Sequence, residues 1–114
     1  MYSLLAGQKL QCSYSYFVSY NGKIGNPGLK AHTDAVDNEF TMTMFVYEAP
    51  LTNPPWIWPI YFVKNAVQQY ELGHWQKQPS PDHSSVVPAV LGIGDALLFR
   101  GRTHPHFRLS LIHI

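Results

Sequence analysis

The sequence predicts a single domain, residues 1–114, built mainly of β structure. Turn-forming residues recur about every eight to twelve positions between short β-prone segments, which is the pattern of a β-sandwich or barrel. Aromatic residues make up 14% of the chain and there are nine prolines, which favours short strands over a helical bundle. Hydrophobic residues at 46% against charged residues at 13% indicate a globular chain and not a disordered one.

Three segments make up the first quarter of the chain. Residues 1–11 carry a weakly amphipathic pattern and are expected to form a short helix or the remnant of a longer element. Residues 12–20 mix Tyr, Phe and Val with alternating polar side chains, which predicts a strand. Residues 21–29 are rich in Gly and Asn and predict an irregular loop that leads to His32.

The clearest strand of the chain is predicted over residues 39–48. Phe40, Met42, Met44 and Val46 fall on one face, and the intervening residues fall on the other, with a period of two. Met42 and Met44 are therefore expected to belong to the core. The following residues 49–55 contain three prolines and cannot form regular structure.

The second half of the chain predicts further short strands separated by turns. They are expected at residues 57–64, 67–72, 86–93, 96–100 and 106–114. Pro59 cannot donate to a ladder, so it should lie at a sheet edge or near the start of its strand. Residues 73–85 read as a long exposed loop that could carry substrate specificity. Asp95 follows Gly94 in a tight turn and is expected to be structural.

His32 and Asp34 are the candidate metal ligands near the N-terminus. In an extended backbone, side chains two positions apart point to the same side, so this imidazole and this carboxylate face a common point. A third ligand should come from a distant part of the chain, and His106 is the working assignment. Two histidines and one carboxylate form the facial triad of non-haem Fe(II) oxygenases. His104 is the competing third ligand, although Pro105 would more naturally begin the strand than lie inside it.

A double-stranded β-helix is the fold that we expect from these features. This jelly-roll arrangement, also called cupin-like, brings an early and a late strand together at one open mouth. Residues 1–11 are the only candidate for a helix, so few or no helices should brace the sheets.

The composition limits the classes of partner and the cellular compartment that we expect for this protein. The net charge is +1 with scattered Lys and Arg, which gives no electrostatic footprint for nucleic acid. Cys12 is the only cysteine, so no intrachain disulfide can form and a reducing compartment is favoured. The first ten residues lack a signal-peptide pattern, and no stretch reaches the roughly 20 apolar residues of a membrane span. We therefore expect a soluble, cytoplasmic protein with no membrane partner.

Several passages of the chain resemble the superfamily of 2-oxoglutarate and Fe(II)-dependent oxygenases, and in particular its prolyl-hydroxylase-like members. The passages are residues 20–34, which end in His-x-Asp, then Glu39-Phe40-Thr41, and then residues 94–101 (GDALLFRG), which precede His106-Phe107-Arg108. The resemblance extends from about residue 14 to the C-terminus, which is nearly the whole chain.

The resemblance implies an oxidoreductase that holds Fe(II) through His32, Asp34 and His106. The cosubstrate 2-oxoglutarate would chelate the metal through its keto-acid end, and dioxygen would convert it to succinate and carbon dioxide. Such a dioxygenase acts as a hydroxylase on a substrate whose identity the sequence leaves open.

The resemblance also implies residues for cosubstrate binding. Arg108 and Ser110 look like the family's Arg-x-Ser element, in which the guanidinium pairs with the far carboxylate of 2-oxoglutarate. Tyr20 is a further candidate for a hydroxyl contact, as are Tyr16 and Thr43.

Two departures from the family pattern keep other readings open. The family's basic residue lies further beyond the distal His, whereas only eight residues follow His106. The shortage of helices indicates a domain shortened at one or both ends, or a sheet covered by a partner or by self-association into a homo-oligomer. The alternatives are a non-catalytic cupin-like module that binds metal or ligand, a cupin enzyme that does not use 2-oxoglutarate, and a Zn hydrolase.

Overall fold

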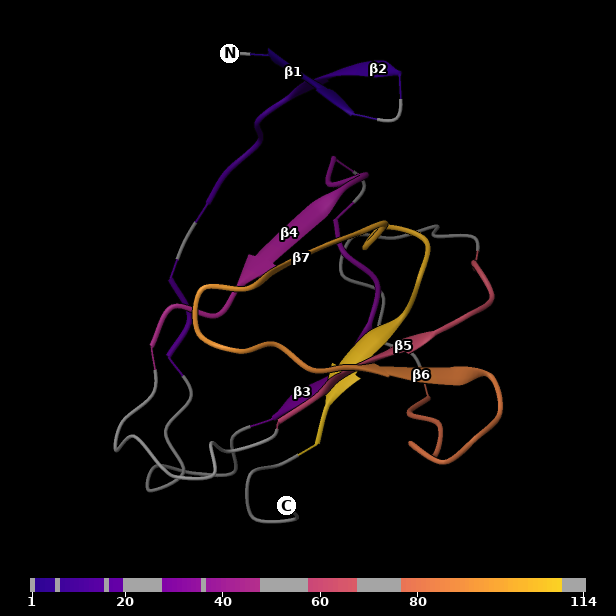
Figure 1. Cartoon of the computed structure of the whole chain (residues 1–114). Coiled ribbons are helices and arrows are strands. Elements are labelled where there is room, and N and C mark those ends of the chain that lie inside the picture. The colour runs from indigo at the N-terminus through magenta and orange to yellow at the C-terminus, as the bar shows by residue number, and fades with distance from the viewer. Residues whose placement is uncertain are drawn as a thin grey trace.

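The computed structural model of the 114-residue chain describes residues 2–5, 7–15, 17–19, 28–35, 37–47, 58–67 and 77–109. These residues form eight strands of three or four residues, and every strand pair is antiparallel (Figure 1). None of the described residues lies in a helix. The predicted mainly β class is therefore confirmed.

The described part of the N-terminal segment is a β-hairpin, so the first of the two possibilities for residues 1–11, a short helix, is wrong. Strand β1 (Tyr2–Leu5) pairs with β2 (Gln8–Gln11), and Leu5 lies opposite Gln8. Gly7 has a φ of 78°, a conformation that two-residue hairpin turns favour and that glycine adopts without strain. The backbone conformation of Gly7 therefore favours a turn at this point, and the helical spacing of the leucines does not determine the structure of the segment.

The strand predicted over residues 12–20 does not form in its described part. Residues 12–15 and 17–19 pair with no strand. Side-chain hydrogen bonds hold this segment instead: Ser13 Oγ donates to Asn38 Oδ1 (2.6 Å), and Asn38 Nδ2 donates to the Tyr14 hydroxyl (2.8 Å). Phe17 is 91% exposed, so the β-prone composition of the segment buries little apolar surface here.

Four strands form the larger sheet, in the order β3-β8-β5-β6. Their bounds are Leu29–His32 for β3, His106–Arg108 for β8, Ile60–Val63 for β5 and Val86–Ala89 for β6. Pro59 stands just before β5, and Pro88 lies in the edge strand β6, where a missing N–H donor is tolerated. Both placements agree with the rule that proline avoids central strands.

Two strands form a second sheet, which carries Thr41. Strand β4 (Thr41–Met44) pairs with β7 (Ala96–Phe99), and Thr41 lies opposite Phe99. Asp95 Oδ2 accepts a hydrogen bond from the Gly92 N–H (2.9 Å), which closes the turn before β7. The structural role predicted for Asp95 is thus confirmed.

The exposed face of β4 contradicts one prediction. Met42 and Met44 are 64% and 51% exposed, whereas they were expected in the core. Thr41 and Thr43 occupy the partly buried face instead. A period of two identifies a strand but not which of its faces turns inward, and here the smaller threonines face the interior.

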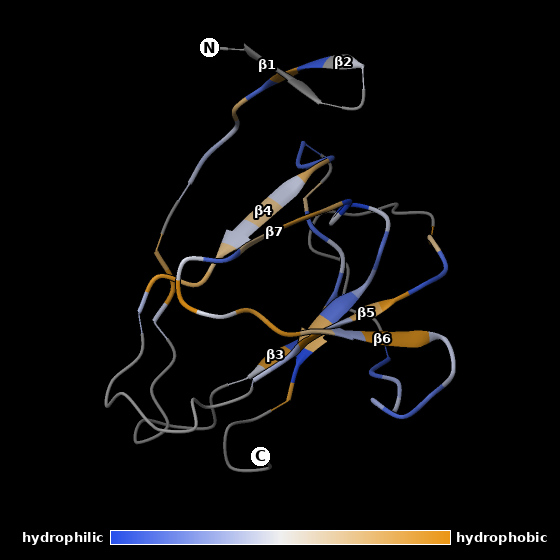
Figure 2. Ribbon diagram, viewed as in Figure 1, coloured by the Kyte–Doolittle hydropathy of each residue, from blue (hydrophilic) through white to orange (hydrophobic). Residues whose placement is uncertain are grey.

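The two sheets face each other across aromatic rings. The ring of Phe62 on β5 lies 4.9 Å from that of Phe99 on β7, and the Phe99 ring lies 4.9 Å from the His106 imidazole. Because of these ring contacts, the side chain of His106 projects into the space between the sheets. Figure 2 shows that β5, β6 and β7 are the most hydrophobic strands, whereas the turn that leads into β8 is hydrophilic.

A buried apolar cluster lies on the opposite face of the larger sheet. Ala31, Val86 and Phe107 form it, with Tyr61 and Leu109 packed against it. Residues 107 and 109 share one face of their segment, so the alternation of a strand places His106 and Arg108 on the other. The core thus supports the back of the sheet whose front carries the histidines.

The strand pairs are nested along the chain. The first strand of the two sheets, β3, pairs with the last, β8; the next, β4, pairs with β7; and β5 pairs with β6. Because β5 also pairs with β8, the pairs β3-β8 and β5-β6 belong to the larger sheet, whereas β4 and β7 form the other sheet. Successive pairs therefore alternate between the two sheets.

A search of the described residues for membrane-spanning helices found none of sufficient length and hydropathy.

Candidate metal centre

Strand pairing brings His32 and His106 together from opposite halves of the chain. His32 ends β3, His106 begins β8, and the two residues are direct partners across the antiparallel pair. Asp34 lies two residues beyond His32, where its N–H donates to the Gly101 carbonyl (2.8 Å). That bond connects the end of β3 to the turn that follows β7, and it holds Asp34 beside the two imidazoles.

The three side chains present one ligand atom each to a common point. Asp34 Oδ1 lies 3.2 Å from His106 Nε2 and 3.5 Å from His32 Nε2, and all three ligand atoms lie within 4.8 Å of one another. Neighbouring ligands at about 2.1 Å from a metal are about 3.0 Å apart in octahedral and about 3.4 Å apart in tetrahedral geometry. The two distances to Asp34 fit a coordinated ion.

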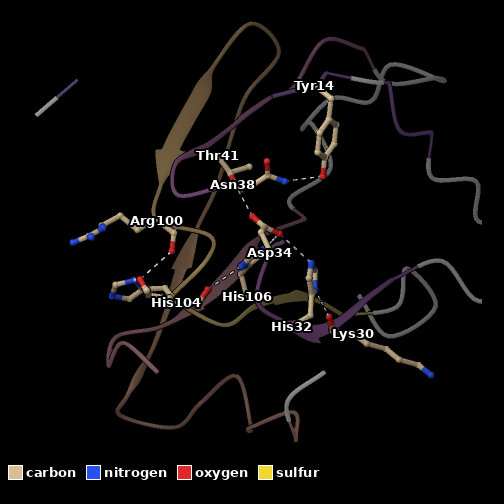
Figure 3. Close-up of polar contacts among 10 residues, drawn as sticks. Tyr14, Lys30, His32, Asp34, Asn38, Thr41, Arg100, His104 and His106 are labelled. Atoms are coloured by element: carbon tan, nitrogen blue, oxygen red, sulfur yellow. Dashed lines mark hydrogen bonds and ion pairs between the residues drawn. The ribbon is translucent and has the colours of Figure 1, made fainter. Parts of the chain in front are cut away.

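The backbone selects the imidazole tautomer that metal binding needs. His32 Nδ1 lies 2.7 Å from the Lys30 carbonyl oxygen, and His106 Nδ1 lies 2.9 Å from the His104 carbonyl oxygen (Figure 3). A carbonyl oxygen only accepts, so each Nδ1 carries a proton and donates it. In a neutral imidazole the lone pair is then on Nε2, the nitrogen that faces Asp34 and could bind a metal, whereas a second proton on Nε2 would be donated to the carboxylate.

A hydroxyl group holds the second oxygen of the carboxylate. Thr41 Oγ1, at the start of β4, donates to Asp34 Oδ2 (2.7 Å). Figure 3 shows Asp34 between Thr41 on one side and the two imidazoles on the other. Oδ2 is thereby engaged in a hydrogen bond with Thr41, and Oδ1 alone faces the histidines.

The electrostatics keep the carboxylate charged. Burial alone would raise the pKa of Asp34, but hydrogen bonds with His106, His32 and Thr41 and the charge of His106 hold that pKa well below its usual range. Burial would lower the pKa of His32, but hydrogen bonds with Asp34 and the Lys30 carbonyl and the charge of Asp34 raise it above the ordinary value of 6.5. These interactions therefore favour a positive charge, either a proton or a metal cation, between the Asp34 carboxylate and the two imidazoles.

One side of the cluster is closed and the other is partly open. His106 is 3% exposed, with the rings of Phe99 and Phe62 beside it. The side chains of His32 and Asp34 each remain 16% exposed. A ligand could therefore approach the cluster from the side of these two residues.

Two residues that fix the geometry were not anticipated as site residues. Thr41 was named only within the predicted strand and the Glu39-Phe40-Thr41 passage, and Gly101 only as the last residue of the passage 94–101. Neither passage indicated a contact with Asp34, because both residues act on it through contacts between separate segments.

His104, the competing third ligand, lies outside the cluster. Its N–H donates to the Arg100 carbonyl (3.1 Å), and its Nδ1 lies 3.0 Å from the Thr103 hydroxyl. These bonds belong to the turn before β8. Among the described residues, His106 is thus the histidine that joins His32 and Asp34.

Arg108 is engaged with the segment before β5. Its Nη1 donates to the Trp58 carbonyl (2.9 Å), and its guanidinium lies 4.6 Å from the centre of the Trp58 ring, in cation–π range. The other residues proposed for cosubstrate contacts, Tyr20 and Ser110, lie outside the described residues, as does Tyr16. Thr43 is on the partly buried face of β4.

Comparison with protein-family models, with curated proteins and with solved structures gave no match to this chain. The conclusions about its chemistry therefore depend on the donor set and its geometry.

Proposed function

We propose that the chain is an Fe(II)- and 2-oxoglutarate-dependent dioxygenase that hydroxylates a substrate still to be identified. The cluster of His32, Asp34 and His106 carries this proposal. Two neutral imidazoles and one carboxylate on one side of an ion leave other coordination positions open, which is the ligand set of non-haem Fe(II) oxygenases. Soft thiolate ligands, which structural zinc sites favour, are absent from the cluster.

The nested strand pairs support a double-stranded β-helix as the fold. An antiparallel ribbon in which β3 pairs with β8, β4 with β7 and β5 with β6 can be wound so that successive pairs fall on alternate sheets. That winding is the jelly-roll arrangement. It explains why ligands from β3 and β8 meet on the inner face of one sheet.

The side chains would divide the work as follows. His32 and His106 would bind the metal through Nε2, and Asp34 through Oδ1, while Thr41 keeps the carboxylate oriented. When bound, Fe(II) and 2-oxoglutarate supply the oxidising chemistry that converts a C–H bond to C–OH. Tyr20 and Ser110 stay proposed hydroxyl contacts to the cosubstrate.

Arg108 is the proposed partner of the far carboxylate of 2-oxoglutarate. It shares a face with His106 and lies two residues, about 7 Å, further along β8. A guanidinium presents its five N–H donors as a planar fork that matches a carboxylate, and here its Nη1 donates to the Trp58 carbonyl.

A non-catalytic, cupin-like module that binds metal or ligand is the second candidate. The contact between Arg108 and Trp58 favours it, because a guanidinium already bonded to a carbonyl and stacked on an indole has a structural role of its own. In this alternative the metal site persists without the cosubstrate.

Anaerobic titration distinguishes these functions. Fe(II) and then 2-oxoglutarate are added to the wild type, Asp34→Ala and Arg108→Ala, and the visible charge-transfer band of the chelate is followed. The oxygenase predicts a band that Asp34→Ala abolishes and Arg108→Ala weakens. Metal binding without a band would favour the non-catalytic module, and absence of metal binding by the wild type would exclude both.

A further inference from the structure

Gly101 is buried beside Asp34 in the turn that follows β7. A Cβ atom at this position would overlap Asp34 Oδ2, and it would lie only 2.7 Å from Asp34 Cγ and 2.8 Å from Thr41 Oγ1. Real Cβ atoms essentially never approach other heavy atoms closer than 3.0 Å. Any side chain at position 101 must therefore displace the carboxylate or the hydroxyl.

The backbone of Gly101 gives no other reason for a glycine here. The described glycines with positive φ are Gly7 and Gly94, and Gly101 is not among them. Alanine would thus be compatible with the local backbone conformation. The conflict at position 101 is with the Asp34 side chain and with the hydroxyl bonded to it.

Three contacts converge on Asp34 from this side of the site. The Gly101 carbonyl accepts from the Asp34 N–H (2.8 Å), the Thr41 hydroxyl donates to Oδ2 (2.7 Å), and the missing side chain of Gly101 provides the space that Oδ2 occupies. With Oδ2 in that space, Oδ1 faces His106 Nε2 at 3.2 Å. The carboxylate can then offer the metal one oxygen only.

We infer that Gly101 and Thr41 form a carboxylate clamp, defined by these two residues, that positions Asp34 as a ligand through one oxygen. This inference depends on the proposed metal centre and adds two positioning residues to it. Ligation through a single oxygen keeps a further coordination position available for small molecules. Outer-sphere groups of this kind change metal affinity by about 10- to 100-fold when they are altered.

A double-mutant cycle with Mn(II) alone tests the clamp. Calorimetry on the full chain compares the wild type, Gly101→Ala, Asp34→Ala and the double variant, and Gly92→Ala is the matched control. Gly92 also lies in a turn, but a Cβ there would meet only Asp95, at 3.3 Å for the nearest atom. We expect Gly101→Ala to weaken Mn(II) binding about 10- to 100-fold and Gly92→Ala to leave it unchanged.

The cycle separates positioning from a general effect on the fold. If Gly101 acts through Asp34, Gly101→Ala causes no further loss of affinity in the Asp34→Ala background. Wild-type affinity for Gly101→Ala would overturn the inference, and so would equal losses in the two backgrounds.

A second pair of variants covers the case in which Gly101→Ala does not fold. Thr41→Val removes the hydroxyl at similar size, and Thr41→Ser retains it. The clamp predicts a loss of at least about tenfold for the valine variant and near-wild-type affinity for the serine variant. Equal affinities for the two would overturn it.

The carboxyl resonance of Asp34 gives a readout that needs no metal. Its ¹³C shift in the metal-free protein should change in Thr41→Val and Gly101→Ala but not in Gly92→Ala. A wild type that fails to bind metal would contradict the proposed function while this shift still tests the clamp. An unchanged shift in both clamp variants would contradict the clamp whatever the metal result.

Discussion

His32 and His106 are direct partners across the antiparallel pair of β3 and β8, with ring centroids 4.5 Å apart and an angle of 54° between the ring planes. Both rings face the same side of the sheet, and both donate Nδ1–H to the carbonyl two residues before. Each histidine is thus held in the same way, by a hydrogen bond from its Nδ1 to a backbone carbonyl of its own segment.

The first prediction concerns which histidine is the third ligand. His106→Ala should weaken Mn(II) or Fe(II) binding by more than the roughly 100-fold limit of outer-sphere changes, because Nε2 of this residue is a proposed ligand atom. His104→Ala should bind metal within a few-fold of the wild type, since its imidazole contacts Thr103 in the turn and the variant keeps the backbone carbonyl that accepts from His106. Isothermal titration calorimetry measures both, and the opposite ranking would assign the ligand to His104.

Metal affinity should depend on pH through His32. Its pKa lies above the ordinary value of 6.5, so below that pKa the imidazole is protonated and a metal must displace the proton. Affinity should therefore fall as the pH decreases through this pKa, and binding should release protons. Calorimetry in buffers with different ionisation enthalpies counts these protons, and no proton uptake by the buffer near pH 6.5 would contradict the expectation.

Thr33→Val should stabilise the protein. Thr33 is fully buried and lies between His32 and Asp34 in the sequence, and its hydroxyl has no hydrogen-bond partner among the described residues. Replacing an unsatisfied buried hydroxyl with a methyl group of similar size should raise the unfolding free energy by about 1 kcal/mol. Chemical denaturation measures the change, with Thr43→Val as a control on a partly buried face. A destabilised variant would show that the hydroxyl has a partner after all.

Phe107 and Met42 should differ sharply in their contribution to stability. Phe107 is fully buried in the cluster behind β8, so Phe107→Ala should cost about 3–5 kcal/mol. Met42 is 64% exposed, so Met42→Ala should change the unfolding free energy by about 0.5 kcal/mol or less. Urea unfolding compares the two, and equal costs would mean that the outer face of β4 is covered in solution.

The sequence was most informative where a local rule determines the outcome. The two-residue spacing of His32 and Asp34 places both side chains on one side, and the structure brings them together with His106. Pro59 and Asp95 also took the positions that their backbone chemistry predicts, before a strand and in a turn.

The sequence was least informative where long-range packing determines the outcome. The alternation in β4 predicted a strand. Which face of that strand turns toward the interior depends on long-range packing, and that packing leaves Met42 and Met44 exposed. The β-prone residues 12–15 and 17–19 found no ladder, and side-chain bonds to Asn38 hold part of that segment instead. Gly101 matters to Asp34 only after two distant segments have met, so no pattern near either residue could reveal it.

The nested pairing of strands also has a consequence for how the site comes into being. The contact between β3 and β8 closes a loop that contains most of the chain, and contacts of such long range form slowly because of their entropy cost. A partly folded chain would have His32 and Asp34 without His106, and so would hold metal weakly. Tight metal binding should thus coincide with the last stage of folding, and added metal should slow unfolding more than it speeds refolding.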